Sequence, residues 1–281
     1  MNLHRVLAGV SLQAPNPRAP LTAAEVAALA HAELEVMTVL ASPWELVPAE
    51  EVEGLRRSHG GSPAEVAAQR ACERLEHMAG PAVLAALRVT YRAAFGWPSV
   101  ELVRRAEETS ADLIVLGGSG RATVGPAEDV TPATLRRSRV PVLIAPPVHE
   151  VYQRVLACVD NSPCAAKVLE AATALGHCLG VPTVALHVES ASSGVVAGGG
   201  RRPWLSRLEE GAGGGTALAL ETVIRQGDVV SEVLSEADNG PAALIVFGYH
   251  RGMNYGAAGA VTTVAARLLR RAKHALLAVP V

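Results

Sequence analysis

Short apolar runs alternate with segments of helical periodicity along the whole chain. Two of these runs, LIVLG at 113–117 and VLIA at 142–145, contain only apolar residues and glycine. An unbroken apolar run of this length is typical of a strand buried on both faces, so helices are expected on both sides of the sheet. Strands that alternate with helices indicate βαβ units. The sequence therefore predicts an α/β fold with a mostly parallel sheet.

The pattern predicts strands and helices in both halves of the chain. In the first half we expect strands near 5–11, 34–40, 83–90, 112–117 and 140–145, with helices near 21–32, 63–78, 98–109 and 129–138. In the second half we expect strands near 154–160, 182–188, 217–225, 243–248 and 275–279, with helices near 163–178, 228–238 and 262–273. Each half thus contains enough strands for a five-stranded sheet.

The two halves also repeat one another. RVLAGVSLQ at 5–13 matches RVLACVDNS at 154–162, and RRSRVPVLIAP at 136–146 matches RRAKHALLAVP at 270–280. Between them, ADLIVLGGSGR at 111–121 corresponds to AALIVFGYHR at 242–251. Because the matches keep the same order, we predict two copies of one domain, at 1–148 and 149–281. Residues 189–215, rich in Gly and Ser, are predicted to form a flexible loop of the second copy.

The composition fits this interpretation and excludes some classes of protein. A chain of 281 residues accommodates two domains of ordinary size, ~100–200 residues each. Its formal net charge of -2 does not indicate a surface for nucleic acid. No stretch approaches the ~18 apolar residues of a membrane span, and the apolar run at 6–12 lacks the features of a signal peptide. We expect a cytoplasmic protein that does not interact with membranes.

Cysteines and histidines show no pattern of metal binding or catalysis. The four cysteines form no CxxC pair, and we expect them to be reduced structural thiols: Cys72, Cys158, Cys164 and Cys178. The nine histidines include no HExxH motif. No nucleophile and base can be paired, so neither a catalytic residue nor a metal site is predicted.

Open parallel sheets bind ligands beyond the carboxyl ends of their strands. The predicted ends carry Ser11 and Asp160 after the first strands, Val39 and Val188 at the second strands, and glycine loops after the fourth. With these strand ends, the sequence resembles the universal stress protein family in a tandem form, and the resemblance covers nearly the whole chain. The resemblance is carried by VLACVDNSPCAAKVLEAA at 155–172, by LIVLGGSGR at 113–121, and by the endings TLRRSRVPVLIAP and ARLLRRAKHALLAVP.

This resemblance implies the fold and a function. It implies two flavodoxin-like, Rossmann-like doubly wound domains that pair through their last strands as a pseudo-dimer, with a homodimer as a further expectation. Members that bind ATP have an Asp at the end of the first strand and a backbone contact at the end of the second. Their glycine loop reads G-x2-G-x9-G-S/T, and it wraps the phosphates at a helix N-terminus, which attracts anions.

The first half departs from this pattern and is expected to be a degenerate site. Ser11 stands where the family has Asp, and Val39 ends the second strand. The loop begins with Gly117 and Gly120 at the family's spacing. However, Glu128 and Asp129 occupy the later Gly and Ser/Thr positions, and two carboxylates would repel a phosphate. The two glycines are therefore expected mainly to turn the chain, while Glu128 and Asp129 favour the start of a helix.

The second half retains more of the pattern. Asp160 ends the first strand and Ser162 follows it, as in the family, although Ser162 is also a good N-cap for a helix that starts at Pro163, and both interpretations can hold together. Val188 ends the second strand, where an adenine would lie. The loop contains Gly248, then Arg251 in place of a glycine, then Gly252, with Thr262 and Thr263 at the Gly-Ser positions. His250 and Arg251 add positive charge. The expected nucleotide-binding residues are Asp160, Val188, Gly248, Arg251, Gly252, Thr262 and Thr263.

Three functions remain open at this point. The resemblance implies a stress-response regulator or sensor that binds ATP or AMP, with or without Mg²⁺, in the second domain and does not turn it over efficiently. The acids of the first loop favour an interaction module with two inactive pockets. A slow ATP-cleaving enzyme would need Asp160 to hold a metal or to orient water, and no general base accompanies it.

Overall fold

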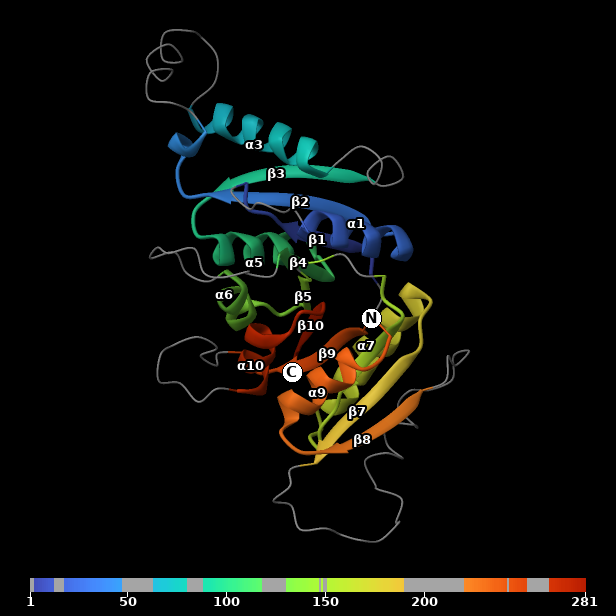
Figure 1. Cartoon of the computed structure of the whole chain (residues 1–281). Helices are drawn as coiled ribbons and strands as arrows, with labels where there is room; N and C mark the ends of the chain where they lie inside the picture. Colours follow the sequence, from blue (N-terminus) through green and yellow to red (C-terminus); the bar gives the residue numbers. More distant parts are fainter. Residues whose placement is uncertain are drawn as a thin grey trace. The chain divides into compact units, whose positions relative to one another are not determined.

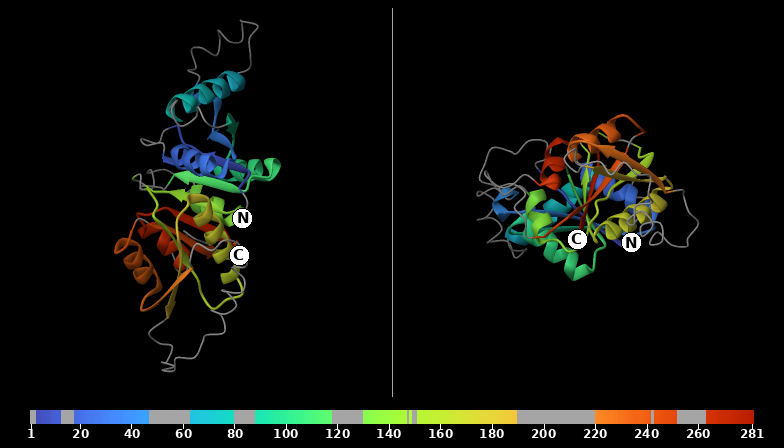
Figure 2. Two further views of the ribbon diagram at one scale, coloured as in Figure 1. Left: turned by 90° about the vertical axis from the view of Figure 1, so that its right-hand side faces the viewer. Right: turned by 90° about the horizontal axis from the view of Figure 1, so that it is seen from below.

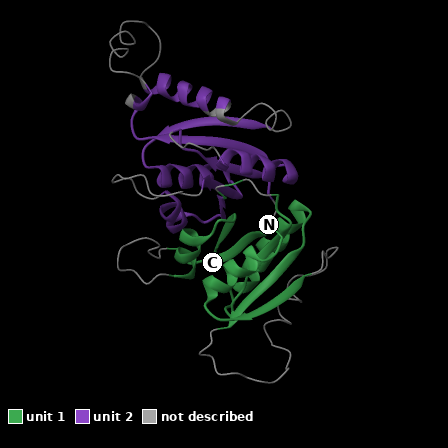
Figure 3. Ribbon diagram, viewed as in Figure 1, with its two compact units in different colours: residues 1–2, 146–281 green, residues 3–145 purple. Residues whose placement is uncertain are grey.

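A computed structural model of the chain describes residues 3–12, 18–46, 63–79, 88–117, 130–146, 148, 151–189, 220–241, 243–251 and 263–281. Residues 3–145 and residues 146–281 form two compact units, coloured separately in Figure 3. We call them the N-terminal unit and the C-terminal unit. Among the helices within the described ranges, none combines the length and the apolar character that a membrane span requires.

The N-terminal unit is built on a parallel sheet. Its strands lie in the order β3-β2-β1-β4-β5 (Figure 1), and every neighbouring pair is parallel. The strands are β1 (Arg5–Gly9), β2 (Glu33–Leu40), β3 (Val89–Phe95), β4 (Leu113–Gly117) and β5 (Val142–Ala145). The helices are α1 (Arg18–Ala30), α3 (Pro63–Ala79), α5 (Pro98–Thr109) and α6 (Val130–Arg137), with a short 3-10 helix, η1 (Pro43–Glu45).

The C-terminal unit repeats this topology. Its strands follow the order β10-β9-β6-β7-β8, again with parallel pairs, and β8 lies beside β7 at the edge (Figure 2). They are β6 (Arg154–Cys158), β7 (Thr183–Glu189), β8 (Glu221–Gln226), β9 (Ala243–Tyr249) and β10 (Leu276–Pro280). The helices are α7 (Ala165–Leu179), α9 (Val229–Asp238) and α10 (Val264–Arg271). The strand order reverses between β6 and β9.

The central strands are buried on both faces, as their apolar runs predict. In β4 the residues from Leu113 to Leu116 are all buried, and in β6 so are those from Arg154 to Ala157. Successive side chains of a strand point to opposite faces, so a fully buried run requires cover on both sides of the sheet. This confirms the prediction of an α/β fold with doubly wound, mostly parallel sheets.

Two glycines mark corresponding turns of the two units. Gly96 precedes α5 with a φ of 137°, and Gly227 precedes α9 with a φ of 149°. Both values lie in a region that side chains rarely adopt, so glycine is the residue that this turn favours. A Cβ added at these positions would also approach Glu101 and Glu232, respectively. The repeat seen in the sequence is therefore a repeat of local backbone geometry as well.

The third strand of the N-terminal unit differs from its prediction. The expected strand at 83–90 followed the apolar run VLAAL, of which residues 83–87 lie outside the described ranges, and the strand found is Val89–Phe95. β3 is an edge strand, and its residues alternate between half-buried and exposed from Val89 to Arg92. The prediction was wrong because the continuous run resembles a central strand, whereas an edge strand with one solvated face alternates.

Candidate functional site

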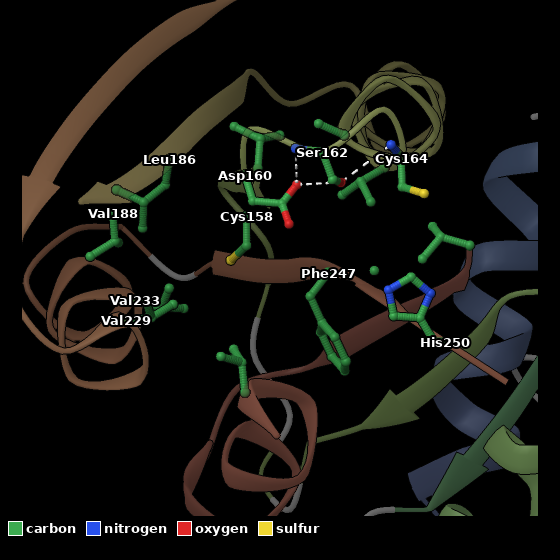
Figure 4. Close-up of a pocket in the computed structure, with 16 residues that line it drawn as sticks. Cys158, Asp160, Ser162, Cys164, Leu186, Val188, Val229, Val233, Phe247 and His250 are labelled. Carbon is green, nitrogen blue, oxygen red and sulfur yellow. Dashed lines mark hydrogen bonds between the residues drawn. The ribbon is translucent and has the colours of Figure 1, made fainter. Parts of the chain in front are cut away.

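A cavity of about 320 Å³ opens at the carboxyl ends of β6, β7 and β9 in the C-terminal unit (Figure 4). It lies where the strand order reverses, which is the usual ligand position in an open parallel sheet. Its volume is at the lower end of the ~300–1,000 Å³ of small-molecule sites. The cavity is lined by Cys158, Val159, Asp160, Ser162, Cys164, Ala165, Val168, Leu186, Val188, Val229, Val233, Phe247, Gly248, His250, Val264 and Val281.

Asp160 lies at the polar side of this cavity, in the turn between β6 and α7. Its Oδ1 accepts hydrogen bonds from the Ser162 backbone N–H at 3.0 Å and from the Ser162 hydroxyl at 2.6 Å, drawn in Figure 4. The Ser162 hydroxyl oxygen in turn accepts a bond from the Cys164 N–H at 3.3 Å. These bonds fix the exposed carboxylate beside the cavity. Ser162 therefore orients Asp160, whereas the N-cap of α7 is Cys164, so the alternative interpretation of Ser162 as the N-cap was wrong.

His187, a buried residue of β7, supports the same turn and was not singled out from the sequence. The side chain is 5% exposed, and its Nδ1 lies 2.8 Å from the Val159 carbonyl oxygen. Because a carbonyl oxygen only accepts, Nδ1 carries the hydrogen of this bond. Val159, in turn, donates its N–H to the Leu186 carbonyl at 2.9 Å. A histidine between two apolar residues of a buried strand was the signal for this role, but its partner is twenty-eight residues away in sequence.

Apolar side chains form the opposite wall of the cavity. Leu186 and Val188 share one face of β7, since they are two residues apart, and Val229 and Val233 are one turn apart on α9. All four line the cavity, and Figure 4 shows them on the side away from Ser162. This wall suits a flat apolar ring system. Val188 lies where the sequence predicted it, at the end of the second strand of the unit.

The end of β9 contributes Gly248 and His250 to the cavity. Gly248 lines the cavity, and a Cβ at this position would lie 3.1 Å from Val168 Cγ2 and 3.4 Å from both Cγ atoms of Val281. A side chain at this position would therefore be tightly packed against Val168. His250 also lines the cavity and is exposed, and Arg251, the next residue, is exposed as well.

The N-terminus of α10 lies at the same cavity. Val264 lines it, and Thr263 is the N-cap, with an Oγ1 that accepts a hydrogen bond from the Ala266 N–H at 3.2 Å. A hydroxyl that accepts such a bond still has its own hydrogen to donate. Gly252 and Thr262, the other predicted loop residues, lie outside the described ranges. The structure therefore places Asp160, Val188 and Gly248 in one cavity, with Arg251 and Thr263 each next to a lining residue.

In the N-terminal unit, leucines occupy the space beside Gly9, the residue that corresponds to Cys158 of the cavity. Gly9 ends β1 as Cys158 ends β6, and a Cβ on Gly9 would lie 2.7 Å from Leu116 Cδ2 and 2.9 Å from Leu102 Cδ1. By the repeat, Leu102 and Leu116 correspond to the cavity residues Val233 and Phe247 of the other unit.

The predicted residues of the degenerate site are placed only in part. Ser11 and Gly117 are exposed and Val39 is half-buried. A Cβ on Gly117 would meet nothing within 4 Å. Gly120, Glu128 and Asp129 lie outside the described ranges. Among the residues that the structure does describe, no three His, Cys, Asp or Glu side chains are grouped as metal ligands.

Comparison with known proteins gives the family of the chain. The model of the universal stress protein family matches twice, at residues 2–146 and at residues 151–280. The chain belongs to the universal stress protein family. Its two matches correspond to the two halves of the sequence repeat, so the chain is a tandem member, as the sequence predicted. No curated protein matched the chain.

Solved structures share the fold over nearly the whole universal stress protein chain. A universal stress protein from Archaeoglobus fulgidus is 17% identical, with a TM-score of 0.65, and the match covers 98% of both chains. A functionally unknown protein from Pseudomonas aeruginosa is 13% identical, with a TM-score of 0.60, and the match covers 99% of this chain and 92% of the other. At such identities these similarities show the tandem Rossmann-like fold.

Proposed function

We propose that this universal stress protein is a stress-response sensor that binds an adenine nucleotide, ATP or AMP, in its C-terminal unit. The observation that carries the proposal is the position of the Asp160 carboxylate, which Ser162 holds at the edge of a cavity walled by Val188 and other apolar side chains. A ribose with vicinal hydroxyls and a base with flat aromatic faces match that combination of one anchored acceptor and one apolar wall.

Asp160 supplies the acceptor for the sugar. Both hydrogen bonds from Ser162 go to Oδ1, and Oδ2 accepts no hydrogen bond from the part of the chain that the structure describes. An ionised carboxylate offers about four lone-pair sites, so the remaining ones can accept from the ribose hydroxyls. Charge-assisted bonds of this kind are stronger than neutral ones.

The phosphates would lie between the end of β9 and the start of α10. In this proposal Gly248 permits close approach of the chain, and His250 and Arg251 provide positive charge. The Thr263 hydroxyl and the first N–H groups of α10 provide donors, with Gly252 and Thr262 completing the loop. For ATP, Mg²⁺ would balance the charge of the triphosphate. The leucines against Gly9 support binding in the C-terminal unit rather than in both units.

A protein that signals through a bound ligand must bind it and then change its partner or conformation. Chemical turnover of the ligand is not needed. We therefore regard the protein as a sensor in the cytoplasm rather than as an enzyme. We also expect the two domains of one chain to pair as a pseudo-dimer, which solution scattering tests. We expect two chains to form a homodimer, which sedimentation tests.

Calorimetric titration of the full chain with ATP and AMP, each with and without Mg²⁺, tests the proposal. We expect one nucleotide per chain, and a loss of affinity of roughly 10- to 100-fold in Asp160→Ala, since hydrogen bonds to charged groups contribute ~1.5–3 kcal/mol. Ser11→Ala, the corresponding position of the other unit, is the matched control and should bind as the wild type does. Absence of binding to the folded wild type at millimolar nucleotide would contradict the proposal.

A further inference from the structure

An ion pair joins the starts of two helices that wall the cavity of the C-terminal unit. Asp228 is the N-cap of α9, and its Oδ1 accepts a hydrogen bond of 2.6 Å from Arg267 Nη2 in α10. Val229, next to Asp228, lines the cavity, and so does Val264, one turn before Arg267 on the same face of α10. The Arg267 guanidinium therefore lies beside the part of the cavity wall that α9 and α10 form.

This guanidinium has donors that the ion pair does not use. An arginine side chain carries five N–H donors, and among the described residues Asp228 alone accepts a hydrogen bond from the Arg267 side chain. The pair is only partly covered, since the Arg267 side chain is 29% exposed and that of Asp228 is 46% exposed. A partly exposed ion pair contributes little to stability, so a change of partner is not costly. A planar guanidinium can also donate two parallel bonds to a phosphate.

Arg267 is placed to reach the phosphates of a bound nucleotide. The proposed function puts these phosphates at the start of α10, whose first N–H groups have no partner within the helix. Arg267 is one turn into α10, and a helical side chain leans toward the N-terminus of its helix. Asp228 opposes such binding, because its carboxylate holds the guanidinium and its charge repels an anion. The hydrogen bond from Arg267 holds the pKa of Asp228 well below its ordinary value, so this carboxylate is charged at neutral pH.

The repeat separates this pair from the needs of the fold. Trp97 stands where the C-terminal unit has Asp228, and Ala133 stands where it has Arg267. The Trp97 side chain makes no capping hydrogen bond, and Ala133 is fully buried. An ion pair that the fold itself required would be expected in both copies. Instead it accompanies the cavity, and it is missing from the unit in which leucines occupy the space beside Gly9.

We propose that Arg267 is a specificity residue of the cavity that binds a phosphate of the ligand, and that Asp228 weakens this binding by competing for the guanidinium. The site then distinguishes a phosphorylated nucleoside from the nucleoside itself. Asp228 keeps its bonds from Ser231 when Arg267 turns to the phosphate, so α9 keeps its N-cap. This inference rests on the proposed function, because it concerns a ligand of the same cavity.

Calorimetric titration of the full chain with AMP and with adenosine tests the inference, because the two ligands differ only in the phosphate. In Arg267→Gln we expect the affinity for AMP to fall about tenfold or more, the usual effect of losing a hydrogen bond to a charged group. The affinity for adenosine should stay the same. In Asp228→Asn the affinity for AMP should rise about two- to fivefold, as expected for a partly exposed competing charge.

Two further variants separate charge from position. Arg267→Lys keeps the positive charge and should recover part of the affinity for AMP that Arg267→Gln loses. Arg271→Gln removes the same charge one turn further along α10, at an exposed position, and is the matched control, which should bind AMP as the wild type does. Far-UV circular dichroism of each variant shows that it is folded.

A purely structural role of the pair gives other results. If Arg267→Gln weakens the binding of AMP and of adenosine alike, the pair only holds the cavity wall in place, and the inference is overturned. A loss of affinity for AMP in Asp228→Asn overturns it as well. The gain in Asp228→Asn should disappear when Arg267→Gln is added, because no guanidinium is then left to release.

The outcomes separate this inference from the proposed function. If the wild type binds AMP and Arg267→Gln binds it equally well, the inference fails and the proposed function stands. If the wild type binds neither AMP nor ATP, the proposed function fails, and titration with inorganic pyrophosphate then decides the inference. Pyrophosphate binding that Arg267→Gln weakens supports it, whereas binding that stays unchanged, or no binding at all, overturns it.

Discussion

Arg267 in α10 donates a hydrogen bond of 2.6 Å from Nη2 to Oδ1 of Asp228, the residue that caps α9. The same Oδ1 accepts bonds from the Ser231 N–H at 3.0 Å and from its hydroxyl at 2.8 Å. Val229, next to Asp228, and Val264, one turn before Arg267, both line the cavity. The ion pair therefore joins the two helices that form this part of the cavity wall.

This pair should make the stability of the C-terminal unit depend on acid pH. The hydrogen bond from Arg267, followed by those from Ser231, holds the pKa of Asp228 well below its ordinary value of 3.8. A carboxyl group whose pKa is lowered by folding stabilises the fold above its unfolded pKa, and that contribution is lost as the pH falls through the folded pKa. Below about pH 3.8 the wild-type Tm should thus fall more steeply than that of Asp228→Asn.

Thermal unfolding followed by circular dichroism between neutral pH and acid measures this difference. Glu221→Gln removes an exposed carboxylate of the same unit and is the control, which should follow the wild type. Parallel curves for wild type and Asp228→Asn across the whole range would show that the ion pair does not couple folding to protonation.

Gly248→Ala should destabilise the C-terminal unit and reduce its cavity. The added Cβ would lie 3.1 Å from Val168 Cγ2, a tight contact against a buried residue of α7. Overpacking of this kind typically costs ~1–3 kcal/mol. Gly117→Ala is the matched control from the repeat, because a Cβ there meets nothing within 4 Å. Urea unfolding of both variants decides the matter, and equal midpoints would contradict the packing argument.

His187→Leu should weaken both folding and nucleotide binding. The substitution leaves the Val159 carbonyl oxygen without the bond that Nδ1 now provides, and an unsatisfied buried acceptor costs ~1–3 kcal/mol. The turn that carries Asp160 follows Val159 directly, so its position should loosen as well. Urea unfolding and AMP titration measure the two effects. His177→Leu, at an exposed position of α7, should change stability by less than ~0.5 kcal/mol.

Gly9→Ala should destabilise the N-terminal unit, and Leu102→Ala should offset part of that loss. The new Cβ would come within 2.9 Å of Leu102 Cδ1, which the second substitution removes. Leu102→Ala alone leaves a cavity and is itself destabilising by ~2–5 kcal/mol. The double variant should therefore be less destabilised than the sum of the single variants, by ~0.5–3 kcal/mol for residues in contact. Strict additivity in urea unfolding would mean that Leu102 does not fill the space beside Gly9.

The fold was largely predictable because its signals are local and periodic. Unbroken apolar runs located β4, β5, β6 and β9 within a few residues, and the internal repeat gave the tandem organisation that the family match confirms. The error at β3 came from the same rule, because a solvated edge strand has a different pattern from a central one. The helix expected from Pro163 begins at Ala165. The residue preferences of helix starts could not tell whether Ser162 orients Asp160 or caps the helix, because serine suits both roles.

The sequence determined which residue types stand at the strand ends, because their order in the chain and in its repeat is sufficient to place them. It therefore indicated Asp160, Val188 and Gly248 before any contact was known. Only the tertiary structure decided that His187 binds the Val159 carbonyl next to Asp160, that leucines fill the space beside Gly9, and that Arg267 binds Asp228. These relationships join residues that are far apart in the chain. They depend on how helices pack against the sheet, and no local pattern records that packing.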